Sequence, residues 1–202
     1  MAQEIINEKK QRLLDTAFSL FTDKGIKNTS IQDIVDNANV AKGTFYLYFK
    51  DKYELRDVLV ARKSKKLFTD AIKSLNKNYI ENFEDQIIYI INYVIDELTK
   101  NQLLLAFISK NLSWGVYHET LVKIYDKNEP DKDAFNELRE MFLDGIKKNN
   151  IKIKNPDVTL FMIIELVSAT AFNAITYKKP LSIEEYKPYL YSTIRLMLRN
   201  EN

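Results

Sequence analysis

The chain has 202 residues, a formal net charge of +2 at pH 7, 46% hydrophobic and 29% charged residues, and no cysteine. Its length allows one large domain or two small ones, and the absence of cysteine excludes disulfides and thiolate chemistry and suits a reducing cytoplasm. A net charge this small does not by itself indicate a nucleic-acid partner, so the placement of charges has to decide.

The composition also bears on location and fold class. The first ten residues lack the apolar core of a signal peptide, and no segment has the about 18 uninterrupted apolar residues of a membrane span. We therefore expect a cytoplasmic protein. Only four Gly and four Pro occur in the chain, so natural breakpoints are few. This scarcity favours an all-α fold.

The N-terminal part of the chain predicts three helices, of which the second and third are joined by a tight turn. The first should end at Gly25. The second opens at Thr29 or Ser30, where a hydroxyl can cap free amide groups, and its apolar residues recur at helical spacing. Asn39 lies where the chain must turn, and Asn tolerates the left-handed conformation well. Lys42 then begins a third helix, whose polar and aromatic groups suit a DNA groove.

Longer helices are predicted for the rest of the chain. A fourth helix should start from a cap at Asp51 and run to about Asn76. The last helix should start at a capping box formed by Ser182 and Glu185. Apolar periodicity and turn signals place the helices of this part at about 51–76, 85–98, 103–114, 134–148, 156–177 and 182–199.

Residues from about Lys9 to Leu59 resemble the DNA-binding domain of the TetR family of bacterial transcriptional regulators. The resemblance is carried by a combination of residues: Ala17, Phe21, Gly25, Thr29, Ile34, Gly43, Thr44, the run from Tyr46 to Phe49, Lys52 and Leu55. The chain departs from the family pattern at Asn39, where Gly is usual, and at Val35, where Ala is usual. Both changes are mild, because Asn can adopt the turn geometry and Val adds little bulk. Beyond about residue 75 only the length and the helical pattern are similar.

The resemblance implies a two-domain architecture. Residues 1–50 would form a three-helix helix-turn-helix DNA-binding domain, 51–76 a connecting helix, and 77–202 a helical ligand-binding and dimerisation domain. It implies a homodimer on a roughly palindromic double-stranded DNA operator, repressing transcription until a small-molecule effector of unknown identity binds. A regulator without such a ligand, or an activator, is the alternative. A helical enzyme or carrier is a more distant one.

The chemistry of the helix-turn-helix residues suggests which side chains meet DNA. Lys42 and Lys52 are cations at helix starts, so attraction to phosphate must outweigh an unfavourable dipole. Thr44 offers a hydroxyl to phosphate and a methyl to thymine. For the aromatic residues, core packing is the alternative. We expect readout of bases by Gln32, Lys42, Thr44 and Leu47, within a DNA-binding set of Thr29, Ser30, Gln32, Lys42, Gly43, Thr44, Tyr46, Leu47, Tyr48 and Lys52.

Aromatic and polar residues of the C-terminal helices are candidates for a ligand pocket. Most are explained equally well as core residues. Glu165 is the sharper signal, because a carboxylate among apolar neighbours needs a partner if it is buried. A cationic ligand, solvent, or a basic residue across a dimer interface would each serve. The candidate pocket residues are Tyr93, Phe107, Asn111, Trp114, His118, Phe142, Glu165 and Phe172.

In the TetR family the last two helices of each subunit pack against their counterparts in a four-helix interface. The corresponding helices here carry small and apolar residues that suit such packing, although packing within one subunit is the alternative. The candidate interface residues are Phe161, Ser168, Ala169, Ile175, Tyr189, Ser192, Thr193, Leu196 and Met197.

The sequence gives little support for catalysis. His118 is the only His in the chain, so neither a His pair nor a Cys–His set is available for a metal. No Gly-rich phosphate-binding loop occurs, and the acidic residues are scattered over polar faces. We therefore expect no enzyme activity, no cofactor and no metal.

Overall fold

The computed structural model describes residues 2–108 and 134–199, and within these ranges every regular element is a helix. The all-α class is confirmed. Three candidate pocket residues, Asn111, Trp114 and His118, lie outside the described residues. The helices are α1 (Ala2–Asp23), α2 (Ile31–Ala38), α3 (Lys42–Tyr48), α4 (Lys52–Leu75), α5 (Phe83–Lys100), α6 (Gln102–Ile108), α9 (Ala134–Lys148), α10 (Pro156–Tyr177) and α11 (Ile183–Met197).

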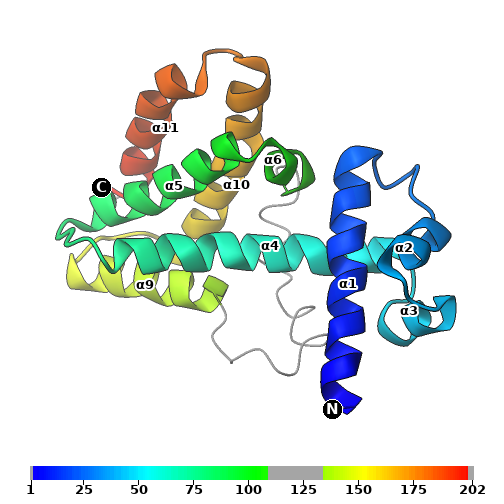
Figure 1. Ribbon diagram of the computed structural model, residues 1–202. Coiled ribbons are helices and arrows are strands. Elements are labelled where there is room, and N and C mark those ends of the chain that lie inside the picture. The colour runs from blue at the N-terminus through cyan, green and yellow to red at the C-terminus, as the bar shows by residue number, and fades with distance from the viewer. Residues whose placement is uncertain (1, 109–133, 200–202) are drawn as a thin grey trace.

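Helix α4 joins two groups of helices (Figure 1). Helices α1, α2 and α3 gather at its N-terminal end, and we call this group the head. Helices α5, α9, α10 and α11 gather around its C-terminal half, and we call this group the body. Each group has its own hydrophobic core: Leu59 is the last α4 residue of the head core, and Leu67 is the first of the body core. The short α6 contacts α1, α4 and α5.

Side-chain caps set several of the helix ends. Asp51 accepts hydrogen bonds from the amides of Tyr53 and Glu54 at 2.8 and 2.9 Å, which fixes the start of α4. At the start of α11 the backbone N–H and the hydroxyl of Ser182 both donate to Glu185, at 3.2 and 2.6 Å. Both caps confirm the sequence predictions. The chain therefore encodes these helix starts locally.

Helix α10 is strongly apolar but only partly buried. By length and composition alone it is the one helix of the described residues that could cross a membrane, and 39% of its most apolar window is buried. The core helix of a soluble protein has the same composition. One side of α10, including Ile163 and Val167, packs into the body core. The other side exposes Phe161 and Met162, at 43% and 52% of their surface.

Polar contacts fix α11 against α5. Lys187 donates to Asp96 at 2.7 Å, and only 11% of the lysine side chain is exposed. The hydroxyl of Tyr191 donates to the amide oxygen of Asn92 at 2.6 Å. Burial raises the pKa of Tyr191 to about 12, so the hydroxyl keeps its proton and remains a donor. These side-chain contacts determine which face of α11 remains outward.

Candidate DNA-binding site and body cavity

The turn between α2 and α3 has the geometry that the sequence predicts. Asn39 adopts the left-handed conformation, with φ 51° and ψ 53°. The N–H of Val40 donates to the carbonyl of Val35 at 2.9 Å, and the Val40 side chain is buried between the helices. Asn thus fills the position that usually requires Gly. The turn holds α3 at a fixed angle to α2.

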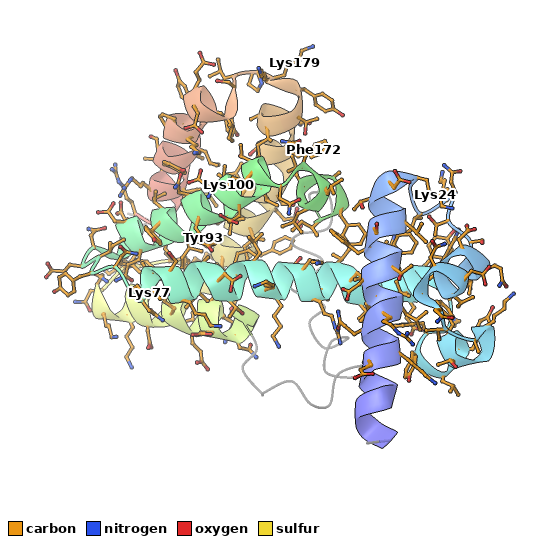
Figure 2. The ribbon with its side chains drawn as sticks, in the orientation of Figure 1. Lys24, Lys77, Tyr93, Lys100, Phe172 and Lys179 are labelled. Carbon is orange, nitrogen blue, oxygen red and sulfur yellow. The ribbon has the colours of Figure 1, made fainter. Side chains whose placement is uncertain are left out.

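A capping box and an ion pair fix the start of α2. The hydroxyl of Ser30 accepts from the amide of Asp33 at 3.0 Å, and the Asp33 carboxylate accepts from the amide of Ser30 at 2.8 Å. Lys24 directly follows α1 and is labelled in Figure 2. Its ammonium donates to the same carboxylate at 3.0 Å. The Ser30 amide and then Lys24 lower the pKa of Asp33 to about 2. Asp33 therefore links α2 to the chain that leaves α1.

Thr29 has a different role from the predicted one. Its side chain is fully buried, and its hydroxyl donates to the carbonyl of Gly25 at 2.9 Å. The cap of α2 is Ser30, one residue later. The predictions that Thr29 caps α2 and meets DNA are therefore wrong, because its hydroxyl satisfies a carbonyl beyond the last turn of α1. Ser30 itself remains exposed.

Lys52 also has a structural role that the sequence does not reveal. Its ammonium donates to the carbonyls of Ile26 and Thr29 at 2.8 Å each, and to that of Lys27 at 3.3 Å. A lysine ammonium has three donors, and all three are used here. The expected phosphate contact is corrected accordingly: Lys52 ties the α1–α2 connection to the start of α4.

The outer face of α3 is the exposed surface of the head that suits DNA. Tyr46 and Leu47 are 53% and 79% exposed, whereas Phe45 is completely buried in the head core. Gly43 has open space around it, so the backbone there can approach a partner closely. The remaining predicted contacts divide by exposure: Gln32 and Lys42 are exposed, whereas Thr44 and Tyr48 are half-buried.

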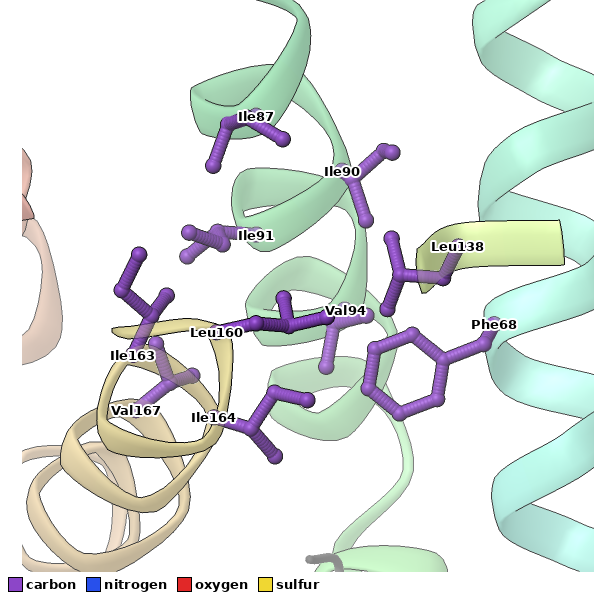
Figure 3. Close-up of a pocket in the computed structure, with 10 residues that line it drawn as sticks. All are labelled: Phe68, Ile87, Ile90, Ile91, Val94, Leu138, Leu160, Ile163, Ile164 and Val167. Atoms are coloured by element: carbon purple, nitrogen blue, oxygen red, sulfur yellow. The ribbon is translucent and has the colours of Figure 1, made fainter. Parts of the chain in front are cut away.

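A small cavity lies inside the body (Figure 3). Its volume is about 30 Å³, close to the space of one water molecule in the liquid. The described side chains that line it are all apolar, so they offer water no hydrogen bonds. The lining residues come from α4, α5, α9 and α10: Phe68, Ile87, Ile90, Ile91, Val94, Leu138, Leu160, Ile163, Ile164 and Val167.

Comparison with known proteins identifies the head. Residues 13–59, from α1 to the start of α4, match the family of bacterial regulatory proteins called tetR. Over 183 residues the chain is 28% identical to the HTH-type transcriptional regulator YhgD of Bacillus subtilis, covering 88% of this chain and 90% of that protein. The HTH-type transcriptional regulator SAR2658 of Staphylococcus aureus is 24% identical over 188 residues, 91% and 90% of the two chains. Residues 13–59 therefore form a DNA-binding domain of the TetR type. The chain is a DNA-binding transcriptional regulator.

Solved structures show that the likeness in fold extends over the body. RolR in complex with resorcinol has a TM-score of 0.70 at 15% identity, over 100% of this chain and 92% of that one. FadR of Bacillus subtilis in complex with stearoyl-CoA has a TM-score of 0.63 at 16% identity, over 95% and 99%. Such low identities establish a shared TetR-like fold and nothing further about the ligand of this regulator.

None of the predicted pocket residues that the structure describes is among those that line the body cavity. Phe142 is completely buried with its ring 5.8 Å from that of Phe83. Phe107 reaches the head, where its ring meets Phe18 edge-on at 5.2 Å. The lining residues carry no sequence signal beyond apolar periodicity, which does not distinguish a void from close packing. The ligand-binding roles of Tyr93, Phe107, Phe142, Glu165 and Phe172 therefore stay predictions.

The predicted interface residues also divide by exposure. Ser168 is 8% exposed and packs within its own subunit, which corrects its assignment. Ile175 and Met197 are half-buried against the body core. Val158 and Met162 are exposed although they were not predicted. The predicted residues that remain outward are Phe161, Ala169, Tyr189, Ser192, Thr193 and Leu196.

The described residues offer no cluster of side chains typical of a metal site. Within 2–108 and 134–199 no group of three His, Asp or Glu side chains is placed to hold a metal ion. Shifted pKa values belong instead to helix caps and to ion pairs within and between helices. Arg139 and Asp157, for example, form two hydrogen bonds of 2.5 and 3.0 Å, which lower the pKa of the carboxyl. These charges hold α9 to α10.

Replacing Lys52 by Ala should destabilise the head. The change removes the ammonium donor that three carbonyls share, and we expect a loss of about 1–3 kcal/mol in the free energy of unfolding. Urea denaturation would measure it. The matched control is Lys42→Ala, because Lys42 is an exposed lysine at the start of α3. Equal stability of the two variants would contradict the structural role of Lys52.

The capping box gives a pH dependence of stability. In the folded protein the pKa of Asp33 falls from 3.8 to about 2. A lowered folded pKa stabilises the protein above the unfolded value, and this stabilisation is lost as the pH falls through the folded value. Asp33→Asn should therefore be less stable than wild type at pH 7, and the difference should shrink between about pH 4 and pH 2. The measurement is the urea midpoint of both proteins against pH, with Asp23→Asn as control. A pH-independent difference would argue against the ionised cap.

Proposed function

We propose that this regulator is a dimeric repressor that occupies a roughly palindromic DNA operator and leaves it when a small molecule binds in the body. The observation that carries the proposal is the outer face of α3, held outward by a rigid head. Two such heads related by a two-fold axis require two half-sites related in the same way. The proposed domains are 1–50 for DNA binding, 51–76 as connecting helix, and 77–202 for effector binding and dimerisation.

On the operator, α3 would lie in the major groove. Lys42 and Tyr46 would contact phosphates, which supply affinity and fix the register. Gln32, Thr44 and Leu47 would meet base edges, where an amide, a hydroxyl and an apolar group can distinguish base pairs. Gly43 would let the backbone approach the DNA. Ser30 would present the start of α2 to a further phosphate.

Dimerisation through α10 and α11 is supported by apolar surface. Phe161 and Met162 on α10, and Tyr189 and Leu196 on α11, are between 43% and 66% exposed. The two helices contact each other within one subunit, so these side chains belong to adjacent surfaces. A patch of this kind on a soluble protein is typical of an interface. A second copy of the same chain would cover it with its own α10 and α11.

Coupling between body and head is supported by aromatic packing at α6. Phe107 packs on Phe18 of α1, and the ammonium of Lys63 on α4 lies 4.2 Å from the centre of the Phe18 ring. A movement of α4 or α6 would therefore reach α1 directly. The bound resorcinol of RolR and stearoyl-CoA of FadR support a small-molecule effector. Effector and DNA would then weaken each other's binding by the same factor. We further propose a cytoplasmic location.

Lys42→Ala tests the DNA interface. Binding to the DNA that flanks the protein's own gene, measured by fluorescence anisotropy at several salt concentrations, should weaken for all sequences, and the salt slope should fall by about one unit. Lys77→Ala is the control, because Lys77 is exposed at the far end of α4 (Figure 2). If both variants bind DNA with the same affinity and slope, Lys42 does not contact phosphate.

Phe161→Asp tests the assembly. A carboxylate in an apolar interface loses its hydration without a partner, so the variant should be monomeric at micromolar concentration where the wild type is dimeric. Light scattering measures the oligomeric state of the variant and of the wild type. The control is Tyr79→Asp, because Tyr79 is 94% exposed between α4 and α5. A dimeric Phe161→Asp protein would place the interface elsewhere.

A further inference from the structure

A basic groove runs from the head to the body along one face of α4. It is a hollow of about 680 Å³ lined by residues of α1, α4 and α9. Among the described residues that line it, every cation comes from α4, and three acidic side chains face five basic ones. The basic residues occupy one side of the helix: three of them lie four and seven positions apart on one face, and the other two flank that face. They are Arg62, Lys63, Lys65, Lys66 and Lys73.

The described residues that line the groove carry more basic than acidic side chains. Like charges three or four residues apart on a helix repel one another. The ion pair between Lys66 and Asp70 at 2.7 Å offsets little of this, because 74% of the lysine side chain is exposed to solvent. Lys73 has no ion-pair partner among residues 2–108 and 134–199. An anion in the groove would relieve the repulsion and gain several charge-assisted hydrogen bonds.

The groove and the body cavity share two helices. Phe68 of α4 and Leu138 of α9 line the cavity, and both are labelled at its edge in Figure 3. Their chain neighbours Thr69 and Glu137 line the groove. The seam between α4 and α9 therefore has a basic, solvated side and an apolar, buried side. A molecule that fits both sides has a charged end and an apolar end.

We infer that the effector is an amphipathic anion: an aliphatic chain that enters the apolar cavity, with a carboxylate or phosphate headgroup held by Arg62, Lys65 and Lys66. This inference rests on the proposed release by a small molecule and names the chemistry of that molecule. A cavity of about 30 Å³ holds little more than one methylene. The chain therefore separates α4, α9 and α10 as it enters, and so binds best to a conformation that differs from the empty one.

The headgroup also bears on the head. Arg62 donates to the side-chain oxygen of Gln11 on α1 at 3.2 Å. A carboxylate or phosphate in the groove competes for this guanidinium, because an anionic acceptor forms a stronger hydrogen bond than an amide. Binding then weakens a link between α1 and α4 at the same time as the aliphatic chain displaces α4 from the body. Both changes act on the position of the head.

Calorimetric titration of the full-length protein without DNA tests the inference. The probes are decanoate, decyl phosphate, decanol and inorganic phosphate, each below its micellar concentration. We expect decanol to bind at least about tenfold more weakly than the better of the two anions, because it lacks the charge-assisted contacts. Shortening that anion by one methylene should weaken binding about fourfold. The better anion identifies the headgroup as carboxylate or phosphate.

Two double variants distinguish binding by the groove lysines from a general effect of the protein's charge. Lys65→Gln with Lys66→Gln should weaken binding of the better anion about tenfold and leave decanol unchanged. Lys147→Gln with Lys148→Gln, at the exposed end of α9, removes the same charge and should change neither. Equal binding of decanol and the anions, an unchanged affinity in the groove variant, or no binding of any amphiphile would each overturn the inference.

DNA release is measured separately, by anisotropy with the operator. Binding of the anion without release would contradict the proposed effector control and leave the assigned ligand chemistry in place. Operator binding with no response to any amphiphile in either assay would leave the DNA-binding function in place and overturn the ligand chemistry. The two proposals can therefore fail independently.

Discussion

One helix belongs to two hydrophobic cores, and the rest of the architecture depends on this. Leu59 of α4 is buried with α1, α2 and α3, whereas Leu67 is buried with the body helices. Eight residues of helix span about 12 Å. No flexible linker absorbs movement over that distance, since the backbone hydrogen bonds continue through it. A displacement of α4 in the body therefore moves the head as well, and the aromatic contact between Phe18 and Phe107 adds a second route beside it.

The head can transmit such a displacement only if it is rigid, and polar contacts supply much of that rigidity. Lys52 gathers carbonyls of the α1–α2 connection, and Asp33 joins Ser30 and Lys24. Both sets hold a segment that has few apolar side chains of its own. Lys52 illustrates a limit of sequence reasoning, because a lysine at a helix start suits a phosphate and a group of carbonyls equally well. Only the fold decides which partner it meets.

Local chemistry was predictable, and long-range packing was not. Asn39 in the left-handed turn, the Asp51 cap and the capping box at Ser182 depend on residues within a few positions, so sequence spacing contains the necessary information. The body cavity depends on how four helices meet. Apolar periodicity marks Ile90 as buried but does not reveal whether the space beside it is filled. Phe142, one of the aromatic residues that suggested a pocket, packs against Phe83.

Helix α10 connects the cavity with the proposed interface. Ile163 and Val167 line the cavity on its inner side, while Phe161 and Met162 are exposed on its outer side. Since a packed helix moves largely as a rigid body, a molecule that widens the cavity and shifts α10 also shifts the surface that meets the second subunit. In a two-fold dimer both heads are positioned relative to that surface. The spacing of the two α3 helices on DNA would then depend on α10 as well as on α4, and a ligand occupying one cavity would alter the geometry of both subunits.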